Sequence, residues 1–244
     1  MGGRAISPVR ALRLSTGLLL AGQLLYVVVT QLHVGGDANN HPAIFAAYAA
    51  NGIWKAVHLG QFASMAILIA RLLALFLALD VQDDTARWAA RVGSAFAVAA
   101  LALYGVLQAV DGVALKQAVN AWASSSEAEK AARFSSAEAI RWLEWGVRSY
   151  QDFAQGLALL LCAVAMARML WVPRPLAYLM GLSGLAYLVQ GWVVGSEGFS
   201  PMHSAAIVLA WILSLVWMLW LAVVAWRMQG SELANDGGGL PSAS

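Results

Sequence analysis

The chain has 244 residues, of which 61% are hydrophobic and only 11% are charged, and its mean hydropathy is +0.68. Soluble domains usually carry about a quarter charged residues, so this composition excludes an ordinary soluble protein and indicates a lipid environment. The net charge of +2, with no dense run of basic residues, argues against a nucleic-acid partner.

Six apolar segments are long enough to cross a bilayer, which takes about 20 residues of helix. They lie at about 12–32, 54–79, 92–115, 149–171, 175–195 and 204–227. Helices satisfy their own backbone hydrogen bonds in lipid, so we expect an all-α, polytopic bundle that forms one domain over residues 1–228. The expected location is the cell membrane, with the lipid bilayer as partner and a homo-oligomer left open. The glycine- and serine-rich end, 229–244, is expected to be a disordered tail.

The basic residues of the short loops predict the orientation, because Lys and Arg gather on the cytoplasmic side of membrane proteins. If the six spans alternate in direction, one side receives Arg4, Arg10, Arg13, Arg87, Arg91, Arg174 and Arg227. We therefore expect both termini in the cytoplasm and the long segment 116–148 outside.

The outer segment 116–148 is polar but contains two helix-start signals. "SSSE" (124–127) and "SSAE" (135–138) each place a serine three residues before a glutamate, the arrangement of a capping box. We expect a short helix over about 126–134, and a second, amphipathic helix that begins near 136 and continues into the fourth span.

Polar side chains recur at helical spacing toward the outer ends of several spans. Ionisable groups at membrane depth normally face the protein interior or a cavity, so we expect a shared outer cavity. Its expected lining is Gln61, Gln108, Asp111, Glu144, Arg148 and Asp152, with Trp192 and Trp211 as apolar wall. Few polar groups among many apolar ones suit a small, partly apolar ligand. Alternatively, the charges on the fourth span form i,i+4 pairs that only support the helix.

The four histidines, His33, His41, His58 and His203, all fall on the outer half. Imidazole suits zinc, copper and iron, and two histidines on different helices can hold a haem axially. A second hypothesis is that His58 and His203 bind a transition metal or haem. His33 would then be a third ligand, with Asp111 or Glu197 as an oxygen donor. It remains open that His58 only bonds a neighbouring helix, and that His33 and His41 are solvated residues of a turn-rich loop.

Known catalytic signatures are missing from the sequence, which contains no HExxH, Walker loop, GxSxG or cysteine-based metal motif. A secondary transporter would favour internal repeats and a site at mid-membrane, and neither pattern is visible. The classes that remain are an outward-facing binding or sensory protein and a membrane enzyme or redox protein that uses the histidines.

Three stretches carry a family resemblance: "ALRLSTGLLLAGQLLYVV", "VHLGQFASMAILIARLLALF" and the hairpin "LALLLCAVAMARMLWVPRPLAYLMGLSGLAYLV". In these stretches the chain resembles a family of bacterial six-helix membrane proteins described as a domain of unknown function. The resemblance covers most of residues 12–228 and implies the six-helix fold. It contains no catalytic signature and therefore implies no functional residue.

Overall fold

A computed structural model describes residues 8–78 and 83–236, and within these ranges it contains helices and no strand. The elements are α1 (Pro8–Thr30), α2 (His41–Ala50), α3 (Trp54–Ala78), α4 (Asp84–Ala109), the π-helix η1 (Val110–Leu115), α5 (Lys116–Ala123), α6 (Glu127–Ala167), α7 (Arg174–Glu197) and α8 (Pro201–Asp236). Six helical stretches of the described chain are long and apolar enough to cross a membrane. The expected all-α membrane bundle is confirmed.

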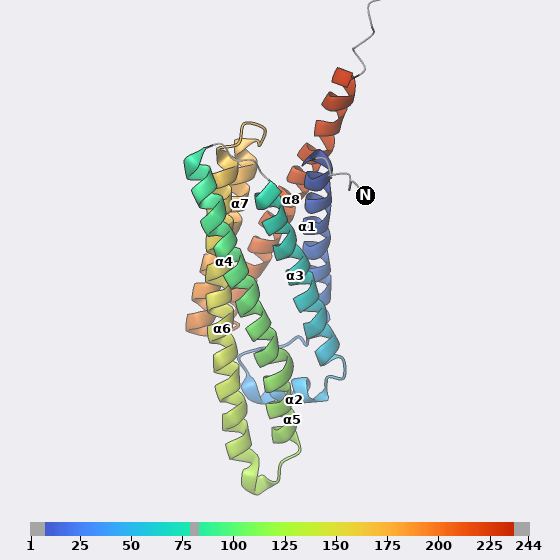
Figure 1. Cartoon of the computed structure of the whole chain (residues 1–244). Helices are drawn as coiled ribbons and strands as arrows, with labels where there is room; N and C mark the ends of the chain where they lie inside the picture. The colour runs from blue at the N-terminus through green and yellow to red at the C-terminus, as the bar shows by residue number, and fades with distance from the viewer. Residues whose placement is uncertain (1–7, 79–82, 237–244) are drawn as a thin grey trace, which may run out of the picture.

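The six long helices form a closed ring in chain order (Figure 1). α1 packs against α3, α3 against α4, α4 against α6, α6 against α7, α7 against α8, and α8 returns to α1. The start of α1 and the end of α8 lie at the same end of the ring, where Arg13 Nε donates to the carbonyl oxygen of Ala225 at 3.1 Å. An even number of spans brings the two ends of the chain to one side.

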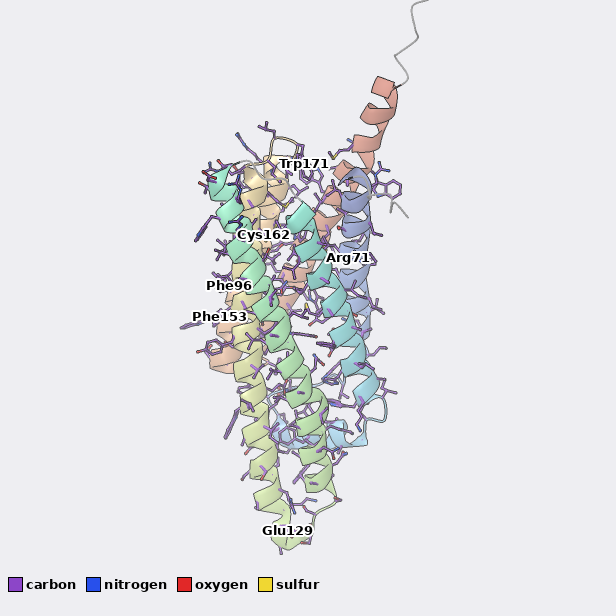
Figure 2. The ribbon with its side chains drawn as sticks, in the orientation of Figure 1. Arg71, Phe96, Glu129, Phe153, Cys162 and Trp171 are labelled. Atoms are coloured by element: carbon purple, nitrogen blue, oxygen red, sulfur yellow. The ribbon has the colours of Figure 1, made fainter. Side chains whose placement is uncertain are left out.

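The interior of the ring is apolar over most of its length. Leu19, Ile69, Leu159 and Trp217 come from four different helices and are almost completely buried. Cys162 also lies inside the bundle (Figure 2), packed close to α4, and is a buried free thiol. Polar side chains are therefore the exception inside the ring, and their positions mark the candidate site.

A single helix, α6, replaces the two helices expected over 126–167, so the expected break near 134–136 is wrong. The backbone is helical through Ser135, the expected cap, and the neighbouring Ser136 Oγ donates to the carbonyl oxygen of Ala132 at 2.9 Å within the same helix. The helix begins after Ser126, and Ser124 ends α5. The N-terminal end of α6, near Glu129, extends beyond the other long helices (Figure 2).

The third span does not end at 115 but continues through η1 and α5 to Ala123. Such π-helical turns are rare and occur frequently at functional sites. A Cβ atom on Gly112 would lie 2.9 Å from the Cβ of His58, so glycine is required for this approach of η1 to α3. The result is that Asp111, on the same turn, is held beside α3.

Helix α2 lies across the end of the ring opposite the start of α1 (Figure 1) and was not expected from the sequence. Its start is capped by Asn40, whose side chain accepts from the backbone N–H of Ala43 at 3.4 Å. Its end is held by Lys116, whose Nζ donates to the carbonyl oxygens of Tyr48, Ala49 and Asn51 at 2.5, 2.9 and 3.0 Å. A cation satisfies free carbonyls and complements the dipole at a helix C-terminus.

Replacing Lys116 with methionine is expected to destabilise α2 by about 2 kcal/mol, the usual range for lost hydrogen bonds to a charged group. Hydrogen exchange followed by mass spectrometry should show faster exchange in residues 41–51 and little change elsewhere. The control is Lys55→Met, because Lys55 is exposed. Equal exchange of residues 41–51 in the two variants would contradict this role for Lys116.

The remaining boundaries agree with the expected spans to within a few residues, except at α4, which begins at Asp84 instead of about 92, and at α8. This helix continues to Asp236, past the expected domain end at 228. Residues 1–7, 79–82 and 237–244 lie outside the described residues, and so do Arg4 and the last part of the expected tail.

Candidate functional site

A cavity of about 520 Å³ lies at the end of the ring that α2 crosses. Its wall is formed by α1, the loop after it, α2, α3, α4, η1, α6 and the start of α8. Eight of the residues proposed from the sequence line it: His33, Gln61, Gln108, Asp111, Glu144, Arg148, His203 and Trp211. Residues separated by up to 178 positions along the chain therefore meet here, at the end of the ring opposite the start of α1.

Three other proposed residues lie elsewhere. Asp152 is fully buried beside Arg148 and does not line the cavity. Trp192 is 71% exposed, on the outer surface of α7, and does not supply apolar wall. Glu197, at the end of α7, is exposed. Asp152 lies on the inward face that the helical spacing predicts, whereas Trp192 and Glu197 lie on exposed faces.

The charges of α6 form two buried ion pairs. Arg148 Nε donates to Asp152 Oδ2 at 3.1 Å, and Arg148 Nη1 donates to the hydroxyl of Tyr26 at 3.4 Å. Glu144 does not pair with Arg148 as the i,i+4 spacing suggested, because Arg141 Nη1 donates to Glu144 Oε2 at 2.7 Å. The carboxylates of Asp152 and Glu144 are thus each paired with an arginine of the same helix.

Arg141 is a cavity residue that the sequence reasoning missed. Its guanidinium lies over the rings of Tyr48 and Phe199, 5.5 and 4.5 Å from their centroids. It also donates from Nη2 to the carbonyl oxygen of Ala38 at 3.2 Å, which connects α6 to the loop after α1. The sequence does contain a signal for Arg141: it lies one helical turn before Glu144, on the same face of the helix as the expected cavity residues.

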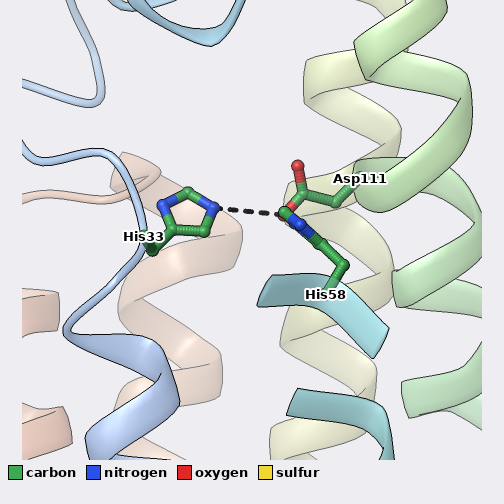
Figure 3. A group of neighbouring side chains, drawn as sticks. All are labelled: His33, His58 and Asp111. Atoms are coloured by element: carbon green, nitrogen blue, oxygen red, sulfur yellow. Dashed lines mark hydrogen bonds and ion pairs between the residues drawn. The ribbon is translucent and has the colours of Figure 1, made fainter. Parts of the chain in front are cut away.

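Two histidines converge on one carboxylate at the edge of the cavity (Figure 3). His58 Nε2 lies 2.9 Å from Asp111 Oδ2, and His33 Nε2 lies 3.9 Å from the same oxygen. The ligand atoms of all three residues are within 4.8 Å of one another. His58 therefore faces other helices rather than lipid, as the sequence predicts.

Backbone carbonyls fix the tautomers of both histidines. His58 Nδ1 lies 2.8 Å from the carbonyl oxygen of Trp54, and His33 Nδ1 lies 3.2 Å from that of Val34. A carbonyl oxygen only accepts, so each Nδ1 carries a proton, and the neutral ring of His33 keeps a free lone pair on Nε2. Nε2 of His58 shares a proton with Asp111 Oδ2 in a hydrogen bond of 2.9 Å. Burial lowers the pKa of His33 and outweighs the raising effect of Asp111, so the neutral imidazole is favoured there.

The other two histidines are not part of this group. His203 packs edge-on to Phe199, with 5.1 Å between ring centroids, at another part of the cavity wall. His41 Nδ1 lies 2.9 Å from Glu138 Oε1, and His41 is buried. The interpretation of His41 as a solvated loop residue is wrong, because it is the first residue of α2 and is buried. His33 does lie in the loop, with its side chain 22% exposed, but it packs on Tyr48 and His58.

The sequence profile of the family described as "Domain of unknown function (DUF4386)" matches residues 14–225. The chain belongs to this family. No curated protein and no solved structure matches it. Membership confirms the resemblance seen in the spans, and the matched range contains every cavity residue named above. The family description assigns no activity, so the function of this DUF4386 protein has to be argued from its cavity.

Several polar atoms of the cavity wall have no hydrogen-bond partner among the described residues of the DUF4386 chain. They include Gln108 Oε1, Asp111 Oδ1 and His203 Nε2. Buried polar groups are normally satisfied by protein, water or ligand. Their positions on three different elements allow one bound molecule to meet several of them at once.

Proposed function

We propose that this DUF4386 protein is a membrane-embedded binding protein whose cavity holds a small, partly apolar molecule at the outer side of the membrane. The observation that carries the proposal is the convergence of polar and aromatic side chains on one cavity of about 520 Å³. This volume falls within the range of about 300–1,000 Å³ that is typical of small-molecule sites.

The two sides of the cavity suit the two parts of such a molecule. Ile207, Val208 and Trp211 of α8 form an apolar side. Gln108 and Arg148 lie on the polar side, on α4 and α6. Both arginines of the wall are already paired with carboxylates, so the site favours an uncharged or zwitterionic polar group over a strongly anionic one.

Thermal stabilisation of the purified protein by a panel of small amphiphiles tests this proposal, because a ligand that binds only the folded state raises its stability. For a compound that binds, Trp211→Leu is expected to weaken affinity about tenfold through the lost aromatic contact. Trp192→Leu is the matched control, because Trp192 is exposed on α7 and does not line the cavity. Equal loss in both variants, or in neither, would count against the cavity as the binding site.

The outward direction of the cavity rests on the proposed cytoplasmic location of both termini. Thr85 lies near the start of α4 and Lys130 near the start of α6, at opposite ends of the ring. A membrane-impermeant thiol reagent added to whole cells should label Lys130→Cys and leave Thr85→Cys unlabelled. The natural Cys162 is buried and gives little background. Labelling of both positions from the same side would contradict six alternating spans, and labelling of Thr85→Cys alone would reverse the orientation.

A further inference from the structure

We infer that His33, His58 and Asp111 bind one divalent transition-metal ion, with Zn²⁺ the first ion to test, at the edge of the cavity. The site joins the loop after α1, α3 and η1. It differs from the arrangement expected from the sequence, in which His203 was a principal ligand. The inference does not depend on the amphiphile proposed above, since metal binding needs only these three side chains.

The donor set and its spacing suit a small ion. Two imidazole nitrogens and a carboxylate oxygen form a common zinc environment, with bonds of about 2.0–2.2 Å that place tetrahedral ligand atoms about 3.3 Å apart. The two contacts to Asp111 Oδ2 measure 2.9 and 3.9 Å, on either side of that value. Movements of the side-chain tips are sufficient to close the site. A haem does not fit between these two imidazoles, because Asp111 Oδ2 lies beside both Nε2 atoms.

The groups around the three ligands already orient them for metal binding. Both Nδ1 atoms donate to backbone carbonyls, which directs both Nε2 atoms at the site. The proton in the 2.9 Å hydrogen bond between His58 Nε2 and Asp111 Oδ2 is released when the ion binds. Trp54 Nε1 donates to the backbone oxygen of Asp111 at 3.2 Å, and its ring packs on both histidines, with centroids 4.9 Å from His33 and 4.5 Å from His58. The π-helix and Gly112 place Asp111 beside α3, and the carbonyl oxygens of Trp54 and Val34 orient the two imidazoles.

A second observation points to a missing partner. Asp111 is only 9% exposed, and its Oδ1 has no hydrogen-bond partner among the described residues. A proton shared between His58 and Asp111 would satisfy one nitrogen but would leave His33 Nε2 and this oxygen unpaired. A metal ion engages both nitrogens and Oδ2 together, and bidentate coordination by Asp111 would engage Oδ1 as well. His33 and Asp111 also line the cavity whereas His58 lies behind them, so the remaining coordination position of the ion opens toward the cavity.

The test measures bound zinc in full-length protein without a histidine tag, purified in detergent, stripped with a chelator and dialysed against ZnCl₂. Wild-type protein is expected to hold about one zinc per chain, and His33→Gln and Asp111→Asn should each weaken binding at least about tenfold. His41→Gln is the matched control, because His41 also contacts a carboxylate but stands outside the group. Zinc should raise the Tm of wild type and of His41→Gln, and not that of Asp111→Asn.

His33→Gln is the primary variant, because the His33 side chain is 22% exposed on a loop and its loss leaves the helical ring intact. Wild-type protein that binds no zinc would overturn the inference and leave the group as a protonated ion pair. Retention of full zinc content by both ligand variants, or its loss in His203→Gln instead, would overturn it equally. None of these results affects the Trp211→Leu comparison, so failure of one proposal remains distinct from failure of the other.

Discussion

Replacing Gly156 with valine is expected to destabilise the protein by about 3 kcal/mol, the upper range for overpacking a close helix contact. A Cβ atom at Gly156 would lie 2.7 Å from the carbonyl oxygen of Gly184, and a Cβ atom at Gly184 would lie 2.8 Å from that of Gly156. The backbones of α6 and α7 are thus in direct contact, as small residues allow in membrane bundles. Neither helix can move away without disturbing its other neighbour in the ring.

Gly146→Val is the matched control, because it makes the same substitution on the same helix at a position with no atom within 4 Å of an added Cβ. Its effect is expected to stay within about 0.5 kcal/mol, because valine and glycine differ little in helix propensity. Thermal or denaturant unfolding in detergent provides the comparison. Similar stability of the two variants would show that α6 and α7 are not in backbone contact at Gly156.

Arg141→Met is expected to cost about 3 kcal/mol, the lower end of the range for breaking a buried ion pair, because water in the cavity reduces the penalty. The substitution leaves the Glu144 carboxylate buried without its cation and removes the stacking on Tyr48 and Phe199. The double variant Arg141→Met/Glu144→Met should recover most of the stability, since it removes the uncompensated charge.

A double-mutant cycle on Tm and on the free energy of unfolding measures this coupling. The matched control is Arg133→Met with Glu129→Met, whose ion pair at 3.9 Å is exposed and should couple by less than about 1 kcal/mol. If the effects of Arg141→Met and Glu144→Met simply added, the pair would not be the buried neutral unit described above. The polarity argued for the cavity would then have to be revised.

The six spans could be predicted because lipid restricts the chain to long apolar helices, a requirement that is visible in local composition. Helix α2 could not be found in this way, since its ten residues are too few to cross a membrane. The signal that does exist is Asn40 followed by Pro42, an N-cap and an early helix proline. The continuity of α6 was missed because a serine three residues before a glutamate, as Ser135 is before Glu138, occurs within helices as well as at their starts.

The sequence predicted that these polar residues lie near the same ends of their helices, but not which of them contact one another. Asp111 and His58 were identified because polar groups inside an apolar span need a partner. Their contact with each other, and with His33, depends on a π-helical turn and on the path of the loop after α1, which no local spacing encodes. Arg141 was overlooked for a related reason. It lies in a polar segment, where an arginine is usually solvated, and only the long-range contacts with Ala38 and Tyr48 show that it is buried.

The most direct measurement of the central claim is an anomalous difference map from crystals of the zinc-loaded protein, recorded on both sides of the zinc absorption edge. The account predicts a peak within about 2.0–2.2 Å of Nε2 of His33, Nε2 of His58 and an oxygen of Asp111. A map without a peak at this position, or with its peak between His41 and Glu138 or beside His203, would contradict it.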